Sequence, residues 1–384
     1  MTDGRAERAF PWRMPARKST ASIEAQPAKH GKTTQTTIRH KTESFFRHFY
    51  QAKITGHSRY CRRSVMQRSA SIDFAKIALA AMVVALHAEI FKETSDYLSF
   101  IFVNGFLRIA VPLFFIINGF YFYNIVAKGK PLLPWAKRMA SLYAVWMVLY
   151  LPFYYPHHPQ SIKEDVEFLL KLVIGYHHLW YLAGSLGAGL VLYWVRGWSD
   201  AKLLTAAVLL FLLGAAAQYV FNYVDSSHLY LNKLFNNYWL FRNFLLLGFP
   251  MYAIGFLIAK GRANALSDST VLALTVLGVL ALFVESSLIY FFHPVRDHFD
   301  NCFSLILACP AIFLFVQRRA GTLTTDLYAK VSTVIYFIHP YFIFAMMGLM
   351  GMHTGTVLFL IAIGLSLLVS PLVIALDRRL KLLL

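Results

Sequence analysis

The sequence predicts an all-α integral membrane protein, a bundle of ten transmembrane helices with both termini in the cytoplasm. Two observations lead there. The chain is 58% hydrophobic and only 15% charged, whereas a soluble domain is about a quarter charged. Its apolar residues also gather in runs of the length that crosses a bilayer, about 20 residues. A soluble enzyme, a fibrous protein and a disulfide scaffold are therefore excluded for the whole chain.

The amino-terminal part differs from the rest in charge. Residues 1–68 hold 15 Lys and Arg against 4 Asp and Glu, within a chain of net charge +18. They show no sustained apolar period, so we predict a disordered cytoplasmic tail followed by a membrane domain over 69–380. Met66, just before the first apolar run, is an alternative start. A basic tail at an anionic membrane surface explains the charge better than nucleic-acid binding, and we expect no nucleic-acid partner.

Ten apolar segments follow the tail, and each is long enough, or nearly so, to cross the hydrocarbon core. The third and the eighth are the shortest. In chain order the predicted spans are 70–90, 98–125, 139–155, 178–195, 203–221, 238–259, 269–291, 301–316, 331–347 and 355–376.

The connecting loops give the orientation. Cytoplasmic loops carry the excess of Lys and Arg, and with the amino terminus inside, the inner loops hold 14 basic residues and the outer loops five. A missed helix would scramble this alternation, but it persists to the end of the chain. The longest outer loop, 156–177, contains a polar stretch from Ser161 to Glu167 that is able to begin a short interfacial helix.

Ionisable and amide side chains occur inside the predicted spans, where charge is costly and usually marks a functional path. The alternative, that some of them only pair with one another to hold the bundle together, stays open. They are Asp73, Lys76, His87, Glu89, Arg108, Asn118, His178, Arg242, Asn243, Glu285 and His339.

The first span places a cation beneath a histidine. Lys76 and His87 are eleven residues apart, which at about 100° per residue puts them on one face of a helix, about 16 Å apart along its axis. Asp73, three residues before Lys76, is close enough to pair with it. A cation near the inner surface can hold a phosphate, and a deeper histidine can take a proton from a hydroxyl. The spacing predicts a site that binds an anionic cosubstrate below and performs chemistry above.

The predicted topology brings other side chains to the depth of His87. His178 and Arg242 begin spans that enter from outside, and Glu285 lies in the outer half of the seventh span. His339 precedes Pro340, where a kink frees backbone groups. A role in capping that kink is as reasonable for His339 as a catalytic one.

Five stretches of the sequence resemble motifs of the acyltransferase 3 family of bacterial membrane acyltransferases, and the resemblance covers residues 68–380. Lys76 with His87 resembles the family's Arg/Lys-x10-His signature, and Asn118 stands where Ser is commoner in the second motif. The motifs, in chain order, are Asp73 to His87, Arg108 to Phe120, His178-Leu-Trp-Tyr-Leu182, Arg242 to Gly255 and Tyr336-Phe-Ile-His-Pro340.

The resemblance implies transfer of an acyl group, most often acetyl, from cytoplasmic acyl-CoA to a hydroxyl of a surface or exported glycan, in the bacterial inner membrane. His87 is then the essential catalytic residue and Lys76 supports CoA binding. Family members often carry a fuller Arg-rich cluster at the start of the third helix, where this chain has only Lys137-Arg138. Acyl-CoA, the glycan acceptor and membrane lipid are the expected partners, with no permanently bound cofactor.

The roles follow as a hypothesis. Lys76, Lys137 and Arg138 attract the CoA phosphates, and His87 acts as general base, or carries the acyl group itself. Glu285 orients His87 or binds the sugar. The remaining residues are expected to stabilise the thioester oxyanion, bind the acceptor or support the site; they are Asp73, Arg108, His178, Trp180, Arg242 and His339.

Other functions remain possible. Ten helices with buried charges also suit a secondary transporter, although no internal repeat is visible. A non-catalytic partner in glycan export is a second alternative. A metal site is not expected, because the pairs His157-His158 and His177-His178 are adjacent and would point apart in regular structure, without a carboxylate or Cys cluster beside them. A solvated or interfacial position suits these histidines better.

Overall fold

The computed structural model describes residues 69–155, 162–224, 238–296, 299–319, 321 and 325–384. All of them belong to one compact unit, Cys61–Leu384. The predicted basic tail, residues 1–68, and the alternative start at Met66 lie outside the described residues.

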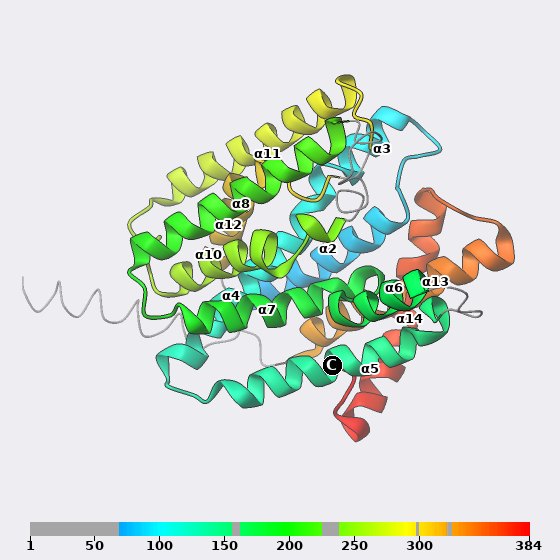
Figure 1. Cartoon of the computed structure of the whole chain (residues 1–384), viewed down its shortest axis with the longest axis horizontal. Coiled ribbons are helices and arrows are strands. Elements are labelled where there is room, and N and C mark those ends of the chain that lie inside the picture. Colours follow the sequence, from blue (N-terminus) through cyan, green and yellow to red (C-terminus); the bar gives the residue numbers. More distant parts are fainter. Residues whose placement is uncertain (1–68, 156–161, 225–237, 297–298, 320, 322–324) are drawn as a thin grey trace, which may run out of the picture. The chain divides into compact units, whose positions relative to one another are not determined.

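The regular elements of the described chain are helices (Figure 1). The longer ones are α2 (Ala70–His87), α3 (Asp96–Val103), α4 (Ala110–Ala127), α5 (Leu132–Tyr154), α6 (Ile162–Ile174), α7 (Trp180–Trp194), α8 (Asp200–Tyr223), α10 (Phe249–Ala259), α11 (Asp268–Phe291), α12 (Leu305–Arg318), α13 (Leu327–Met350) and α14 (Thr356–Leu380).

Six stretches of the described chain are long and apolar enough to cross a membrane by length and composition. Two shorter apolar helices, α10 and α12, occupy the sixth and eighth predicted spans. The described part of the chain is thus all-α and contains six candidate membrane spans, while the count of ten and the orientation stay predictions. The six stretches are Ala70–His87, Asp96–Ala127, Asp200–Tyr223, Asp268–Phe291, Leu327–Met350 and Thr356–Leu380.

Two predicted spans are interrupted. The span 98–125 divides into α3, a short 3-10 helix Phe106–Ile109 and α4, because the backbone leaves the helical region at Gly105 (φ −123°, ψ −96°). The span 238–259 opens with a 3-10 turn and a π-helical turn, Phe244–Gly248, before α10 begins. Side-chain hydrogen bonds to the backbone replace helical ones at such breaks, and hydropathy alone does not reveal them.

The polar stretch in the long outer loop does begin a helix. α6 carries Glu164 and Asp165 in its first turn, where acidic side chains favour the amino-terminal end of a helix. Most of its side chains are exposed, as an interfacial helix requires.

The centre of the unit is the tightly packed pair α4 and α10. A Cβ on Gly119 would lie 2.0 Å from the carbonyl oxygen of Tyr252, and one on Gly255 would lie 2.0 Å from that of Ile116. Only glycine permits this approach of two backbones, a common device between membrane helices. Helices α2, α7, α8 and α12 pack against this pair.

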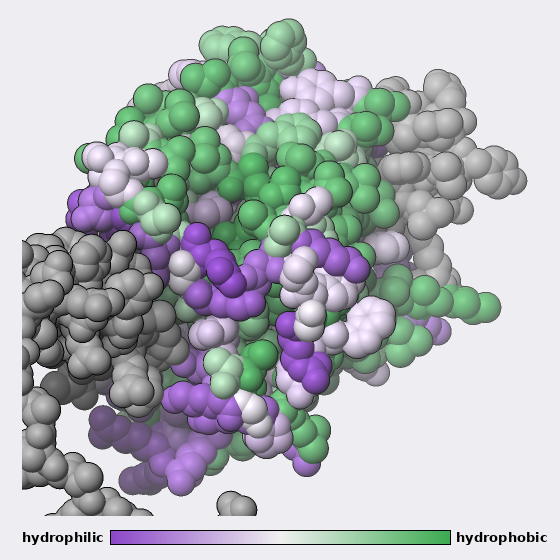
Figure 2. Space-filling view, turned by 90° about the vertical axis from the view of Figure 1, so that its left-hand side faces the viewer, coloured by the Kyte–Doolittle hydropathy of each residue, from purple (hydrophilic) through white to green (hydrophobic). Residues whose placement is uncertain are grey.

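Ion pairs tie the starts of two helices to the ends of their neighbours. Ion pairs join the start of α8 to the end of α10 (Lys260 Nζ to Asp200 Oδ1, 2.5 Å) and the start of α11 to the end of α12 (Arg318 Nη1 to Asp268 Oδ1, 2.7 Å). Figure 2 shows the left-hand side of Figure 1, where hydrophilic side chains gather across the middle and lower part of the face below hydrophobic ones.

Helices α2 and α13 run side by side in the same direction. At their starts, the Ala70 amide donates to the Gly321 carbonyl (2.8 Å) and the rings of Phe74 and Tyr328 are 4.6 Å apart. α14 returns antiparallel, since the Gly355 amide donates to the carbonyl of Ala88, directly after α2 (2.7 Å). This three-helix group positions the polar residues described next.

Candidate active site

Four imidazoles gather where α2 ends. His87 lies between His177 and His339, with ring centroids 4.4 Å and 5.4 Å away. His178 closes the group, 5.7 Å from His177 and 5.4 Å from His339. We call these four residues the histidine cluster. Three of them, His87, His178 and His339, were predicted from the sequence as site residues, and the structure brings them together.

The end of α2 is held by a strained, clamped loop. Glu89 and Phe91 have positive φ values of 50° and 66°, which costs energy for non-glycine residues and persists only where the surroundings impose it. Here the Phe91 amide donates to Thr356 Oγ1 (3.1 Å), and Glu93 Oε1 accepts from the Thr356 amide (3.0 Å). The clamp fixes His87 at the last turn of its helix.

The two adjacent histidines both reach the cluster because the backbone between α6 and α7 is irregular. Gly175 (φ 103°) and His177 (φ 49°) are left-handed, and a Cβ on Gly175 would lie 2.6 Å from the Trp180 amide nitrogen. The hydroxyl of Tyr336 donates to the His178 carbonyl (2.5 Å) and holds the loop against α13.

His339 lies inside α13, which continues past Pro340. Its Nδ1 is 3.0 Å from the Ile335 carbonyl, one turn earlier. That bond fixes the ring and leaves Nε2, directed away from the helix backbone, without a hydrogen-bond partner. The two roles weighed from the sequence, backbone contact near the kink and membership of the site, are both compatible with this position.

The cluster has unsatisfied nitrogens. Buried ring nitrogens without a hydrogen-bond partner are Nδ1 of His177, both nitrogens of His178 and Nε2 of His339. Buried polar atoms in native proteins are usually bonded, so unpaired ones often mark a site of chemistry or of ligand binding. Within the described part of the chain, no group of three or more His, Cys, Asp or Glu has the arrangement that holds a metal ion.

His177, in the loop outside the candidate membrane-spanning stretches, is kept neutral. Burial, and then the positive charge of Arg242, lower the pKa of His177 to about 4. A neutral imidazole has one ring nitrogen that donates a hydrogen bond and one that accepts. His177 therefore faces its neighbours as an uncharged hydrogen-bonding group.

Arg242 borders the cluster. Its guanidinium lies over the rings of Trp180 (5.2 Å) and Tyr238 (5.7 Å), a cation–π arrangement. Its Nη1 is 3.5 Å from Asp300 Oδ2, at the limit of a useful ion pair. Trp180 and Arg242, both predicted site residues, are thus in contact with each other and lie next to the cluster.

A second polar group consists of Arg108, Asp300 and Glu285, which we call the charged network. Arg108 bonds to Asp300, to the Val103 carbonyl (2.8 Å) and to Asn104 Oδ1 (3.1 Å). The contacts with Val103 and Asn104 lie within the break between α3 and α4, and the contact with Asp300 holds that break against the segment before α12. Arg108 thereby supports the architecture around the site.

Glu285 has three hydrogen bonds of its own. It accepts from the Tyr219 hydroxyl (2.5 Å) and from the backbone amides of Phe303 (2.6 Å) and Ser304 (2.8 Å). These amides precede α12, so the carboxylate satisfies donors at the amino-terminal end of that helix. No hydrogen bond or ion pair among the described residues joins Glu285 to His87.

Lys76 lies near the start of α2, far along the helix from the clamped end. Its Nζ is 3.1 Å from Asp73 Oδ1, as the spacing predicts, and 5.2 Å from the ring centroid of Tyr121 in α4. The Asp73 side chain is 1% exposed and that of Lys76 is 20% exposed. The cation therefore retains partial access to solvent.

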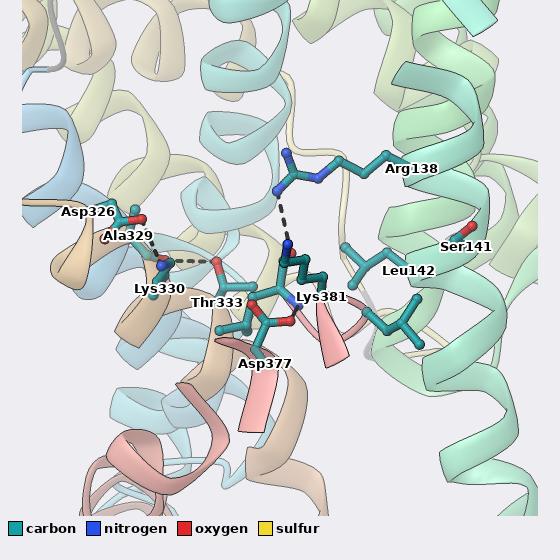
Figure 3. Close-up of a pocket in the computed structure, with 11 residues that line it drawn as sticks. Arg138, Ser141, Leu142, Asp326, Ala329, Lys330, Thr333, Asp377 and Lys381 are labelled. Carbon is teal, nitrogen blue, oxygen red and sulfur yellow. Dashed lines mark hydrogen bonds and ion pairs between the residues drawn. The ribbon is translucent and has the colours of Figure 1, made fainter. Parts of the chain in front are cut away.

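A cleft of 640 Å³ opens among the start of α5, the start of α13 and the end of α14. Figure 3 shows Arg138 reaching across it from α5 towards the end of α14, with Lys330 and Thr333 on α13. Its lining residues are Arg138, Ser141, Leu142, Asp326, Ala329, Lys330, Thr333, Asp377, Lys381, Leu382 and Leu384. Lys137, the neighbour of Arg138, is exposed and does not line it.

The α5–α13–α14 cleft and the histidine cluster share a helix. Thr333 in the cleft and His339 in the cluster are six residues apart on α13, about 9 Å along the axis at 1.5 Å per residue. Neither this cleft nor a second, wholly apolar cavity of 240 Å³ beside α2 is lined by Lys76 or His87.

Sequence reasoning missed three site residues. The expectation that His177 and His178 point apart is wrong, because the left-handed backbone lets both adjacent rings join the histidine cluster. Gly175, two residues earlier, was the available signal of irregular backbone. Lys330 and Lys381 were assigned only to the inner loops, and nothing in the sequence shows that they share a cleft with Arg138.

Comparisons with known proteins give the family of this chain. The family model described as an acyltransferase domain, of the acyltransferase 3 type, matches residues 69–375. An amino-acid racemase of Enterococcus faecalis is 24% identical over 336 residues, 82% of this chain and 47% of that protein. A second racemase from the same organism is 27% identical over 164 residues, 40% of this chain and 22% of that protein. This chain thus spans about half the length of the first relative, and less of the second. No solved structure matches it.

Proposed function

This chain belongs to the acyltransferase 3 family, and from that premise we propose that it transfers an acyl group, most simply acetyl, from cytoplasmic acyl-CoA to a hydroxyl of an exported glycan. The observation that carries the proposal is the position of His87: the histidine of the family signature lies at the centre of an imidazole cluster with unpaired nitrogens. The proposed setting is the bacterial inner membrane.

At His87 the reaction needs one proton transfer in each direction. A neutral imidazole takes the hydroxyl proton while the hydroxyl oxygen bonds to the thioester carbon, and the carbon–sulfur electron pair leaves with sulfur. The imidazolium then returns the proton to the thiolate. A positioned base of this kind contributes about 10²- to 10⁴-fold to rate. An acyl group carried on His87 itself remains the alternative route.

We assign the α5–α13–α14 cleft to the phosphates of the donor. Arg138, Lys330 and Lys381 bring three cations to it, and the hydroxyls of Ser141 and Thr333 add hydrogen-bonding groups. Phosphates bind such groups through charge-assisted hydrogen bonds. Asp326 and Asp377 temper the charge, and Lys330 Nζ pairs with Asp326 at 2.8 Å. The pantetheine arm then follows α13 towards His339 and His87.

Six other predicted residues divide into three groups under this proposal. Arg242 and Trp180, beside the cluster, are placed for the acceptor, because a guanidinium over an aromatic face offers both charge and a stacking surface. Glu285 and Arg108 hold α12 and the α3–α4 break. Lys76, paired with Asp73, serves the donor side of α2.

The test is made in cells. His87→Ala replaces the chromosomal copy, and glycans from the cell surface are compared by mass analysis with wild type at matched membrane levels. We expect the acyl mass increment to disappear. Acylation at the wild-type level would overturn the assignment of His87.

Matched variants test the donor side. Lys330→Gln removes a cation from the cleft, whereas Lys128→Gln removes one from an exposed position outside the cleft lining. We expect the KM for acetyl-CoA to rise about 3- to 10-fold in Lys330→Gln, the loss of one charge-assisted contact worth about 1 kcal/mol. Lys128→Gln leaves it unchanged. Equal KM values in wild type, Lys330→Gln and Lys128→Gln would contradict the cleft assignment. Lys76 is tested separately: full activity in Lys76→Ala would remove it from the donor site.

A further inference from the structure

We propose that His177 is a second catalytic residue, a neutral hydrogen-bond donor to the thioester carbonyl oxygen during acyl transfer at His87. This inference rests on the proposed function and deepens it. It concerns a residue that lies outside the quoted family motifs and for which the sequence predicted a solvated or interfacial position.

Position is the first argument. The ring of His177 is the nearest imidazole to His87, with centroids 4.4 Å apart and planes at 37°. A carbonyl carbon attacked by a hydroxyl that His87 deprotonates must lie within a few ångströms of that ring, because a general base works at hydrogen-bond distance. The carbonyl oxygen on that carbon is then within reach of the adjacent imidazole.

The local backbone is the second argument. His177 has φ 49°, a left-handed conformation that is unfavourable for residues other than glycine and clusters at functional sites. The conformation is what turns this ring towards His87 while the next residue, His178, turns into the core. Tyr336 and Gly175 hold the loop in this shape.

An unpaired donor is the third argument. Nδ1 of His177 is buried and has no hydrogen-bond partner. The environment on every side opposes protonation of the ring: His87 and His178 lie beside it, Phe344 packs edge-on at 5.5 Å, and Arg242 contributes a positive charge. A neutral imidazole in such a place is an electrophile, donating an N–H without giving up its proton.

The balance of the reaction is unchanged by this role. The acceptor oxygen bonds to the carbonyl carbon, the carbon–sulfur bond breaks with its electrons on sulfur, and His87 moves the proton from oxygen to sulfur. His177 keeps its own proton throughout. It stabilises only the negative charge that develops on the carbonyl oxygen, and removing one such donor typically costs 10²- to 10³-fold in kcat.

The experiment compares three substitutions at His177 in the full chain. Membrane vesicles from cells lacking the native copy supply both enzyme and glycan acceptors, acetyl-CoA is the donor, and release of the CoA thiol is measured. His177→Leu removes the N–H but keeps the bulk. His177→Asn restores an N–H close to the position of Nδ1 and tolerates left-handed backbone, and His177→Gln places one nearer Nε2.

We expect kcat to fall 10²- to 10³-fold in His177→Leu, with the KM for acetyl-CoA changed less than threefold. One amide variant, Asn or Gln, restores kcat to within about tenfold of wild type and leaves the pH profile of kcat unchanged. Wild-type kcat in His177→Leu would overturn the proposal. Equal loss in all three variants, or an altered pH profile in the restored variant, would also overturn it by indicating a packing role or a proton-accepting role.

A matched control separates strain from chemistry. His293 is also left-handed (φ 45°), is exposed, and has its closest ring contact with Tyr290 at 6.5 Å, outside the cluster. His293→Leu imposes the same backbone cost and should retain activity; a loss equal to that of His177→Leu would remove the support for a donor. His87→Asn separates failure of the proposed function from failure of this inference. If His87→Asn stays fully active, the proposed function fails. If His87→Asn is inactive and His177→Leu is active, only this inference fails.

Discussion

Two groups of polar side chains interrupt this apolar chain, and they differ in how their atoms are satisfied. In the charged network, Arg108 makes three hydrogen bonds and Glu285 accepts three. In the histidine cluster, four ring nitrogens are buried without a partner. Members of both groups were predicted as parts of one site: Arg108 and Glu285 in the first, and His87, His178 and His339 in the second.

The difference separates structural from functional residues. A buried charge that is fully bonded holds elements together, and its removal leaves a partner exposed to an apolar environment. A buried nitrogen without a partner lowers stability, and such atoms often mark a site of chemistry or of ligand binding. We therefore expect substitutions in the charged network to change stability, and substitutions in the cluster to change activity.

The largest effect is expected at Arg108. Arg108→Leu leaves Asp300 without its closest partner, and breaking a buried pair typically lowers the free energy of unfolding by about 3–5 kcal/mol. Thermal unfolding in detergent measures it. Arg242→Leu is the control, because its 3.5 Å contact with the same carboxylate is weaker and its side chain more exposed; an equal loss in both variants would break the comparison.

Glu285 should follow. Glu285→Ala removes the acceptor for two backbone amides before α12, and loss of a helix amino-terminal cap costs about 1–2 kcal/mol. Turnover of acetyl-CoA per folded molecule should stay within about threefold of wild type. A loss of turnover with unchanged unfolding temperature would instead restore Glu285 to the catalytic role expected from the sequence.

At His178 we expect a smaller effect on stability, with no loss and even a gain. Both of its ring nitrogens are unpaired, so His178→Phe removes buried polar atoms that have no partners, which is nearly neutral or stabilising. The unfolding temperature should stay level or rise while acyl transfer falls. A drop in stability comparable to that of Glu285→Ala would show that the cluster is structural after all.

The smallest effect concerns Glu93, an exposed carboxylate that is fully bonded. Hydrogen bonds from Thr356 lower the pKa of Glu93 below its usual value. A carboxyl with a lowered folded-state pKa adds stability above its unfolded pKa, about 4.3, and loses it as pH falls through the folded value. The unfolding temperature of the wild type should therefore decrease on acidification below about pH 4.3 slightly more than that of Glu93→Gln. Identical curves would show that the clamp has no electrostatic part.

Much of the fold could be predicted from composition. The apolar runs predicted membrane helices, and the spacing of Asp73 and Lys76 predicted their ion pair, because both depend on local sequence. The breaks at Gly105 and Asn243 could not be predicted from hydropathy, because polar side chains close in sequence satisfy the freed backbone there: Arg108 donates to the Val103 carbonyl, and Asn243 Oδ1 accepts from the amides that follow it. Glu285 and His87 were predicted to lie at the same depth in the membrane. Depth does not specify partners, and Glu285 bonds to an amide before α12 instead.

The site was predictable to the same extent. His87, His178 and His339 were identified, whereas His177 depended on a left-handed backbone that periodic reasoning does not contain. The α5–α13–α14 cleft combines the starts of two helices with the end of a third, far apart in sequence. Such a meeting of helix ends is set by packing, and only the three-dimensional structure shows it.

The most direct test of the account uses purified full-length protein in lipid nanodiscs, with acetyl-CoA as donor and an extract of cell-envelope glycans as acceptor. CoA release is followed for wild type, His87→Asn and His293→Asn, with unfolding temperature measured on the same samples. The account predicts a loss of at least about 100-fold in His87→Asn alone, with all three proteins equally stable. Wild-type turnover in a stable His87→Asn protein would contradict it.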